Sequence, residues 1–143
     1  MADLDAMIRV ARESMDRAYA PYSKFHVGVC IRSSDGRLFG GCNVENASFP
    51  EGWCAETSAV AAMILAGARE IAEVVVVATS AEPCPPCGGC RQRLSEFASP
   101  EAPVHMYSRS GARRTVALGE LLPDSFSAEQ LLVPPRPKAF SDL

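Results

Sequence analysis

The sequence predicts a single α/β domain: a three-layer sandwich in which a mixed five-stranded sheet carries helices on both faces. The length of 143 residues suits one compact domain. The hydrophobic content of 48% is enough to form a substantial core. Helical and strand-like segments alternate along the chain, which is the pattern of layered α/β folds.

The first expected element is an amphipathic helix over residues 3–20, ended by Pro21. Its apolar residues recur at helical spacing, with charged residues between them; they are Leu4, Met7, Ile8, Ala11, Met15 and Ala18. Strands are expected over residues 25–33 and 38–43, joined by a turn at Asp35-Gly36. Residues 44–52 are expected to form a loop.

A second helix is expected over residues 53–67, because this segment is rich in alanine and Gly67 can end it. Residues 71–79 contain four consecutive valines and predict a central strand buried on both faces. A short helix is expected from about residue 87 to residue 97, after a segment dense in proline, cysteine and glycine.

The C-terminal third predicts two further strands, over residues 104–107 and 114–117, which bring the sheet to five. Short helical turns are expected over residues 118–122 and 128–132. The proline-rich residues 134–143 are expected to be a loosely held tail.

Composition narrows the possible partners and compartment. The formal net charge of −3 argues against a surface that holds nucleic acid. No apolar run is long enough to span a bilayer, and the N-terminus lacks the features of a signal peptide, so we expect a cytoplasmic protein. In that compartment the six cysteines are expected to be thiols or metal ligands rather than disulfides.

Three of these cysteines form two interleaved CxxC pairs in the segment Cys84-Pro85-Pro86-Cys87-Gly88-Gly89-Cys90. Thiolates three residues apart at the start of a helix can hold one soft metal ion, and the helix N-terminus favours the anionic sulfur. Pro86 lies close to where a helix start tolerates proline, which favours Cys87 and Cys90 as the ligand pair. A redox dithiol is the rival interpretation of a CxxC pair.

Cys54 and Glu56 strengthen the metal interpretation. Cys54 also lies at an expected helix start, and three thiolates would leave the fourth zinc position open, as in catalytic sites. Glu56 could exchange protons with a water whose pKa zinc lowers towards about 7. Alone, Cys54 would be interpreted as a small buried residue and Glu56 as an exposed charge; the downstream pair changes that interpretation.

The pattern Cys-x-Glu followed by Pro-Cys-x-x-Cys resembles the signature of zinc nucleobase deaminases. Further blocks resemble those of the small cytidine deaminases, and the matches run over most of the chain. The blocks are Tyr22–Gly28, Gly41–Ser48, Cys54–Glu56, Cys87–Gln92 and Glu120–Phe126. This resemblance implies the cytidine-deaminase sandwich fold and hydrolytic deamination of cytidine and 2'-deoxycytidine to uridine and 2'-deoxyuridine in pyrimidine salvage.

The resemblance also implies roles for single residues. Cys54, Cys87 and Cys90 would bind one Zn²⁺ per subunit, and Glu56 would transfer protons. Of the substrate-binding residues, Asn43 and Glu45 would hold the ribose hydroxyls, Phe25 would pack against the base, and the backbone of Ala55 would meet the pyrimidine edge. Phe126, together with Phe49, would reach a neighbouring subunit's site in a homotetramer with shared sites.

Two positions depart from the family pattern. Most relatives carry arginine directly after Cys-Ala-Glu, where it offsets thiolate charge, whereas this chain has Thr57. We expect the helix N-termini and Arg91 to compensate, and Thr57 to be able to donate a single neutral hydrogen bond. Cys84 is an extra thiol, which we interpret as a spectator, with a redox-sensitive or alternative ligand as the minority interpretation.

Other functions compete with this prediction. A deaminase of another aminopyrimidine nucleoside, such as blasticidin S, would share the zinc ligands, but that branch lacks a clear Asn-x-Glu pair like Asn43 and Glu45. A non-catalytic zinc-stabilised module and a thiol oxidoreductase are alternatives from other classes. His26 and His105 lie outside any metal spacing, and the cysteine at position 54, where deaminases of nucleotides or nucleic acids usually have histidine, favours a free nucleoside.

Overall fold

The computed structural model describes residues 3–132 and confirms the mixed five-stranded sheet, in the order β2-β1-β3-β4-β5. The strands are β1 (Val27–Ser33), β2 (Leu38–Cys42), β3 (Ile71–Ala78), β4 (Pro103–Tyr107) and β5 (Arg113–Ala117). β1 runs antiparallel to both β2 and β3, β3 and β4 are parallel, and β5 is antiparallel to β4. β2 and β3 therefore end at the same edge of the sheet.

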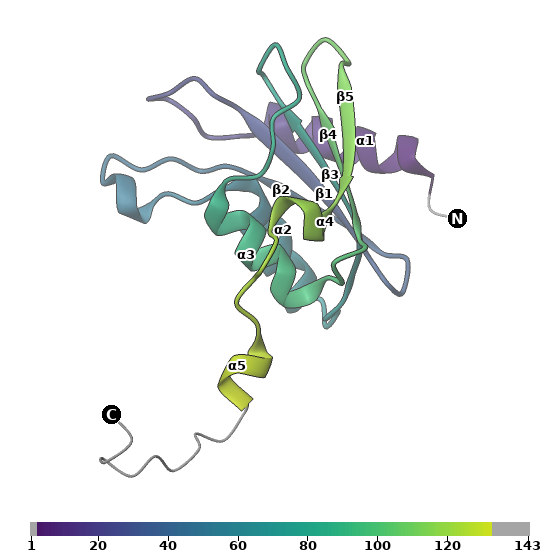
Figure 1. The fold of residues 1–143 in the computed structure, drawn as a ribbon. Helices are drawn as coiled ribbons and strands as arrows, with labels where there is room; N and C mark the ends of the chain where they lie inside the picture. The colour runs from purple at the N-terminus through teal and green to yellow at the C-terminus, as the bar shows by residue number, and fades with distance from the viewer. Residues whose placement is uncertain (1–2, 133–143) are drawn as a thin grey trace.

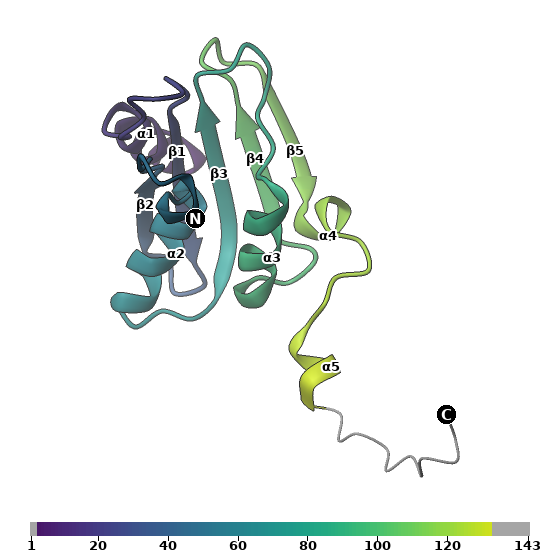
Figure 2. The ribbon, with the colours of Figure 1, turned by 90° about the vertical axis from the view of Figure 1, so that its left-hand side faces the viewer.

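Helices cover both faces of the sheet, as predicted. Figure 2 shows α1 (Leu4–Asp16) behind the sheet, and α2 (Ala55–Leu65) and α3 (Gly88–Phe97) in front of it. The short α4 (Leu118–Leu121) follows β5 on the α3 side, and α5 (Ala128–Leu132) extends away from the sandwich (Figure 1). Since α2 follows β2 and α3 follows β3, both helices begin at the same edge of the sheet.

The core has two parts, one on each side of β3. The four valines Val74–Val77 are at most 1% exposed, which confirms a strand buried on both faces. Val75 and Val77 pack with Met7 and Ala11 of α1. Val74 and Val76 pack with Met63 and Leu94, from α2 and α3.

Glycines allow two helices to lie directly against the sheet. A Cβ on Gly28 of β1 would lie 1.9 Å from the Ala11 carbonyl oxygen of α1. A Cβ on Gly41 of β2 would lie 2.4 Å from both the Ala55 carbonyl oxygen and the Ala59 nitrogen of α2. The first turn of α2 is therefore fixed by contact with β2.

Two local expectations were wrong. The first helix ends at Asp16 instead of continuing to Pro21, because the backbone of Tyr19 bonds to the carbonyl of residue 43 and the N–H of residue 45. The expected loop at residues 44–52 contains a 3₁₀ helix, η1 (Phe49–Glu51), and its first residue pairs with Trp53. The other elements agree closely with their predicted bounds.

Within residues 3–132, no helix combines the length and the apolar character that a membrane crossing requires. The tail predicted at residues 134–143 lies outside the described residues.

Candidate active site

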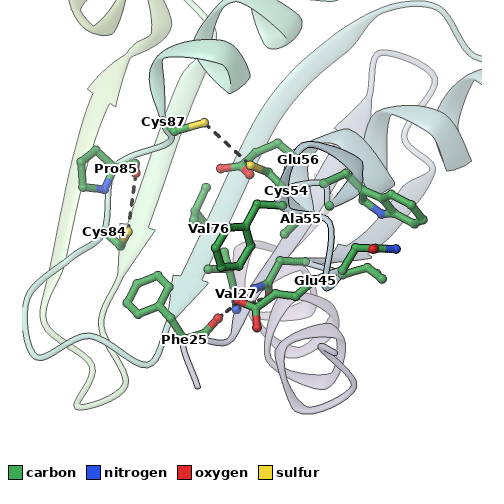
Figure 3. A pocket seen from close by; sticks show the side chains of 16 residues that line it. Phe25, Val27, Glu45, Cys54, Ala55, Glu56, Val76, Cys84, Pro85 and Cys87 are labelled. Carbon is green, nitrogen blue, oxygen red and sulfur yellow. Dashed lines mark hydrogen bonds between the residues drawn. The ribbon is translucent and has the colours of Figure 1, made fainter. Parts of the chain in front are cut away.

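Three predicted ligands lie together where α2 and α3 begin. Cys54 is the N-cap residue of α2, Cys87 is the N-cap residue of α3, and Cys90 lies in the first turn of α3. Their Sγ atoms are all within 4.8 Å of one another, and those of Cys54 and Cys87 are 3.8 Å apart. We call these three residues the sulfur cluster. Figure 3 shows Cys54 and Cys87 pointing toward each other from the two helices.

The fold makes this position suitable for anionic sulfur. Neither helix has a side-chain hydrogen bond at its N-cap, so the first-turn N–H groups are not taken by a capping side chain. The N-terminus of a helix carries partial positive charge, which stabilises a nearby thiolate. Two such termini converge on the sulfur cluster.

The thiols share their protons unequally. A hydrogen bond from Cys90 lowers the pKa of Cys54 to about 6. The same hydrogen bond, together with burial, raises the pKa of Cys90. When a metal cation binds three closely spaced cysteines, it replaces the protons on their sulfur atoms. Soft thiolates are ligands that Zn²⁺ prefers. With three side chains in this group, the donor set fits a zinc ion whose fourth position is free.

Glu56 stands beside the sulfur cluster in the first turn of α2. It is 3% exposed and lines a pocket together with Cys54 and Cys87 (Figure 3). Burial raises the pKa of this carboxyl group above its ordinary value. A carboxyl group that takes up and releases a proton closer to neutral pH is suited to proton transfer.

The pocket beside the sulfur cluster has a volume of about 390 Å³. Of the predicted substrate-binding residues, Phe25, Asn43, Glu45, Phe49 and Ala55 line it. Phe25 and Cys87 lie at opposite ends of the pocket in the view of Figure 3. The pocket therefore offers aromatic surface, polar groups and a metal-binding end within one cavity.

The predicted ribose-binding residues also hold the pocket wall in place. The Asn43 side chain accepts a hydrogen bond from the Val27 N–H and donates one to the Phe25 carbonyl, both at 2.8 Å. Oε1 of Glu45 accepts hydrogen bonds from the backbone N–H groups of residues 22–23, at 3.0 and 3.1 Å. Hydrogen bonds from residue 23 lead the causes that lower the pKa of Glu45, so it is a carboxylate at neutral pH. Its Oε2 makes no hydrogen bond within residues 3–132 and can accept one from a ligand.

The two predicted intersubunit aromatics lie in different places. Phe49 lines the pocket of its own chain, is 77% exposed, and meets Tyr22 edge-to-face with ring centroids 6.4 Å apart. Phe126 is 57% exposed, lies outside the pocket lining, and accepts a hydrogen bond from Gln92 at its carbonyl. The reach of either ring into a neighbouring site stays a prediction.

The Arg91 side chain makes no hydrogen bond to a sulfur of the cluster within the described residues, so compensation by its charge stays a prediction. Arg91 donates to the carbonyls of Pro86 and Leu121, both at 2.8 Å. Instead, Nη1 of Arg93 donates to Cys90 Sγ at 3.9 Å. Sequence reasoning missed Arg93, although its position three residues after Cys90 on a helix is a signal that could have found it.

Thr57 and Cys84 are the two departures from the family pattern. The buried Thr57 Oγ1 makes no hydrogen bond within the described part of the chain. Cys84 lines the pocket, and its thiol donates to the Pro85 carbonyl at 3.6 Å. Burial raises the pKa of Cys84, and its sulfur is outside the group of three.

Comparison with known proteins agrees with this geometry. The family model for the cytidine and deoxycytidylate deaminase zinc-binding region matches residues 1–106. A cytidine deaminase from Sporosarcina psychrophila is 36% identical over 129 residues, which are 90% of this chain and 95% of the relative. A cytidine deaminase from Mycobacterium tuberculosis (strain ATCC 25618 / H37Rv) is 38% identical over 121 residues, or 85% and 87% of the two chains.

A solved structure is similar over the same region. The crystal structure of cytidine deaminase from Burkholderia pseudomallei superposes with a TM-score of 0.83 at 40% identity, covering 87% of this chain and 99% of that one. The segment matched by the family model includes the whole sulfur cluster, Glu56 and the pocket lining.

Proposed function

The chain belongs to the cytidine deaminase family, and on this premise we propose that it hydrolyses cytidine and 2'-deoxycytidine to uridine and 2'-deoxyuridine with release of ammonia. The observation that carries the proposal is the placement of Glu56: a buried carboxyl group beside three sulfurs, at one end of a pocket large enough for a nucleoside. A site of this kind can act on a small ligand that carries no phosphate.

Cys54, Cys87 and Cys90 would hold one Zn²⁺ per chain. When bound, this ion supplies a water molecule acidic enough to act as a nucleophile near neutral pH. Because the chain offers three ligands, a bound ion would keep one coordination position for that water.

Glu56 manages the protons of the reaction. As a carboxylate it takes a proton from the attacking water and delivers it to N3 of the pyrimidine ring. The hydroxide left from that water would add to C4. Glu56, a carboxylate again, then takes the second proton from the new C4 hydroxyl group and delivers it to the amino group. The C4–N bond breaks, ammonia leaves, and C4 becomes the carbonyl carbon of uridine. The low exposure of Glu56, at 3%, keeps bulk water from exchanging the proton during these steps.

Other pocket residues hold the nucleoside. Glu45 keeps one carboxylate oxygen for a ribose hydroxyl, and Asn43 stands beside it on the same wall. Phe25 offers an aromatic face to the base, and the backbone of Ala55 stands next to the sulfur cluster, where the polar edge of the pyrimidine would lie. A sugar-binding carboxylate favours a free nucleoside over a base alone.

We further propose a homotetramer with sites shared between subunits, acting in the cytoplasm in pyrimidine salvage. The support is the exposure of large aromatic side chains beside and beyond the pocket, with Phe49 at 77%, Phe126 at 57% and Trp53 at 49%. Exposed aromatic groups of this size are typical of surfaces that another chain covers.

The proposed reaction is tested by following the loss of cytidine absorbance with and without a zinc chelator. We expect turnover of cytidine and 2'-deoxycytidine, abolished by the chelator and restored by added Zn²⁺. A panel including blasticidin S separates the nearest alternative, because turnover of that compound without turnover of cytidine would contradict the proposal. So would cytidine turnover that persists in the metal-free protein.

A further inference from the structure

We propose that Arg93 is a positioning residue that offsets the negative charge of the sulfur cluster and thereby sets how tightly the cluster retains Zn²⁺. The inference rests on the proposed zinc site and adds a residue outside its ligands and its pocket. Arg93 lies in the second turn of α3, and its guanidinium reaches back to Cys90 Sγ at 3.9 Å.

The sulfur cluster needs a positive partner. Three thiolates carry one more negative charge than Zn²⁺ carries positive charge, so the loaded site keeps a net negative charge beside a buried carboxyl group. Charge-assisted hydrogen bonds to a ligand atom are stronger than neutral ones and hold that ligand in place. Thr57 lies next to Glu56 in sequence and has no charge to offer.

Two arginines of α3, Arg91 and Arg93, have different hydrogen-bond partners near the sulfur cluster. Arg91 donates hydrogen bonds to two backbone carbonyls. One of them belongs to Pro86, the residue directly before the ligand Cys87. Arg93 is the arginine of α3 that donates to a sulfur atom. Arg91 therefore supports the backbone of the ligand loop, and Arg93 supplies charge to the ligand itself.

Gly89 provides the space in which the Arg93 guanidinium lies. A Cβ at position 89 would be 3.1 Å from Arg93 Nη1 and 3.8 Å from its Cζ, so the side chain lies over the first turn of α3. A Cβ at the preceding residue, Gly88, would meet no atom within 4 Å. These two glycines form a matched pair: alanine at position 89 requires the guanidinium to move by a few tenths of an ångström from its place beside Cys90, and alanine at position 88 does not.

Zinc affinity, measured by competition with a chromophoric chelator, tests the proposal without depending on enzyme activity. We expect Arg93→Gln to weaken zinc binding about tenfold, a loss typical of groups that support metal ligands. Arg93→Lys keeps the charge and should retain more affinity than Arg93→Gln. Arg113→Gln, on β5, removes an equal charge from an exposed residue that does not line the pocket and should bind zinc like the unaltered protein.

The glycine pair gives a second, independent measurement. Gly89→Ala should weaken zinc binding while favouring the helix, because alanine is the better helix former. Gly88→Ala should favour the helix equally and leave zinc binding unchanged. A merely structural role for this turn would make the two variants behave alike.

Two outcomes would overturn the role of Arg93. One is equal zinc affinity in Arg93→Gln, Arg113→Gln and the unaltered protein. The other is an equal loss of affinity in Arg93→Lys and Arg93→Gln. If the unaltered protein takes up no zinc, the proposed function fails and this inference fails with it. If the unaltered protein binds zinc but the Arg93 variants give either result above, only the inference about Arg93 fails.

Discussion

Thr57 is the residue at which the first turn of α2 departs most clearly from the family pattern, and its buried hydroxyl makes no hydrogen bond within residues 3–132. A buried polar group without a partner lowers stability. We therefore expect Thr57→Val to raise the free energy of unfolding by about 1 kcal/mol, measured by urea denaturation.

The next residue provides the matched control. The Ser58 hydroxyl accepts a hydrogen bond from Trp53 Nε1 at 2.8 Å and donates one to the Cys42 carbonyl at 2.7 Å. Ser58→Ala should therefore lower the free energy of unfolding by about 1 kcal/mol or more. A stability loss of the same size in Thr57→Val would show that the Thr57 hydroxyl has a partner.

Thr57 also gives a prediction about charge. Thr57→Arg would add a positive charge close to the sulfur cluster, which favours the deprotonated form of neighbouring groups. We expect the acidic limb of the pH–rate profile for cytidine to move to lower pH. A profile identical to that of the unaltered protein would reject the idea that position 57 tunes the site.

The metal ligands could be predicted largely from the spacing of cysteines along the chain. Cys87 and Cys90 could be selected because two thiolates three residues apart at a helix start can bind one metal ion. Cys54 could be added because it lies at a second expected helix start, two residues before Glu56.

Helical spacing could have suggested Arg93, which lies three residues after Cys90, but it could not decide between Arg93 and Arg91, because that depends on the directions of their side chains. Arg91 was favoured because it directly follows Cys90 in the sequence, but its side chain donates to the carbonyls of Pro86 and Leu121.

The contacts between β2 and α2 determine where Cys54 and Glu56 stand. Gly41→Ala would bring a Cβ within 2.4 Å of the α2 backbone, so α2 must shift. We expect this variant to lose at least about 1–3 kcal/mol of stability and also to lose turnover in the protein that remains folded. Circular dichroism and the cytidine assay measure the two effects separately.

Gly28→Ala is the control for that prediction, because its Cβ would meet α1 instead. The described part of α1 carries no ligand of the sulfur cluster and does not line the pocket. The Gly28 variant should lose stability and keep its turnover per folded chain. If both variants keep full turnover, α2 does not need close contact with β2 to place the site.

A polar row on the sheet predicts how stability depends on pH. Glu73 of β3 is bonded by Arg32 of β1 and by His105 of β4, whose Nε2 is 2.6 Å away, while His105 Nδ1 is 2.9 Å from Thr115 of β5. Burial alone would raise the pKa of Glu73, but the hydrogen bonds from Arg32 and His105 outweigh it and place the pKa below its ordinary value of 4.5.

The lowered pKa of Glu73 determines the pH range in which this carboxylate stabilises the fold. A carboxyl group with a lowered pKa contributes stability that is fully present above pH 4.5 and is lost as the pH falls through its folded-state value. We expect Glu73→Gln to flatten the fall in unfolding free energy below pH 4.5, measured by urea denaturation at several pH values. A fall as steep as that of the unaltered protein would contradict this contribution.

The elements themselves were predictable where a periodic pattern is local, as in the four valines of β3. The end of α1 was not, because Tyr19 leaves the helix to bond with the backbone of residues 43 and 45, far along the chain. The η1 helix was missed because a single 3₁₀ turn is too short to show a period.

At the scale of the whole molecule, the exposed aromatic side chains predict association. We expect light scattering after gel filtration to give a mass about four times the 15.3 kDa of one chain. A monomer with full cytidine turnover would contradict the proposed homotetramer.

A mixing experiment tests whether sites are shared. Glu56→Gln chains keep Phe126, and Phe126→Ala chains keep Glu56, so mixed assemblies can combine the two intact groups in one site. We expect co-refolded chains to deaminate cytidine faster than the sum of the separate variants. Activity equal to that sum would place Phe126 outside the neighbouring site.

The most direct measurement is the zinc content and cytidine turnover of Glu56→Gln beside the unaltered protein, with Glu101→Gln as a control for loss of an exposed carboxylate. We expect one zinc per chain in all three proteins and an approximately 10³-fold lower rate in Glu56→Gln alone, since general acid–base groups contribute about 10²–10⁴-fold. Unchanged turnover in Glu56→Gln, or no zinc in the unaltered protein, would contradict a zinc deaminase built on Glu56 and the sulfur cluster.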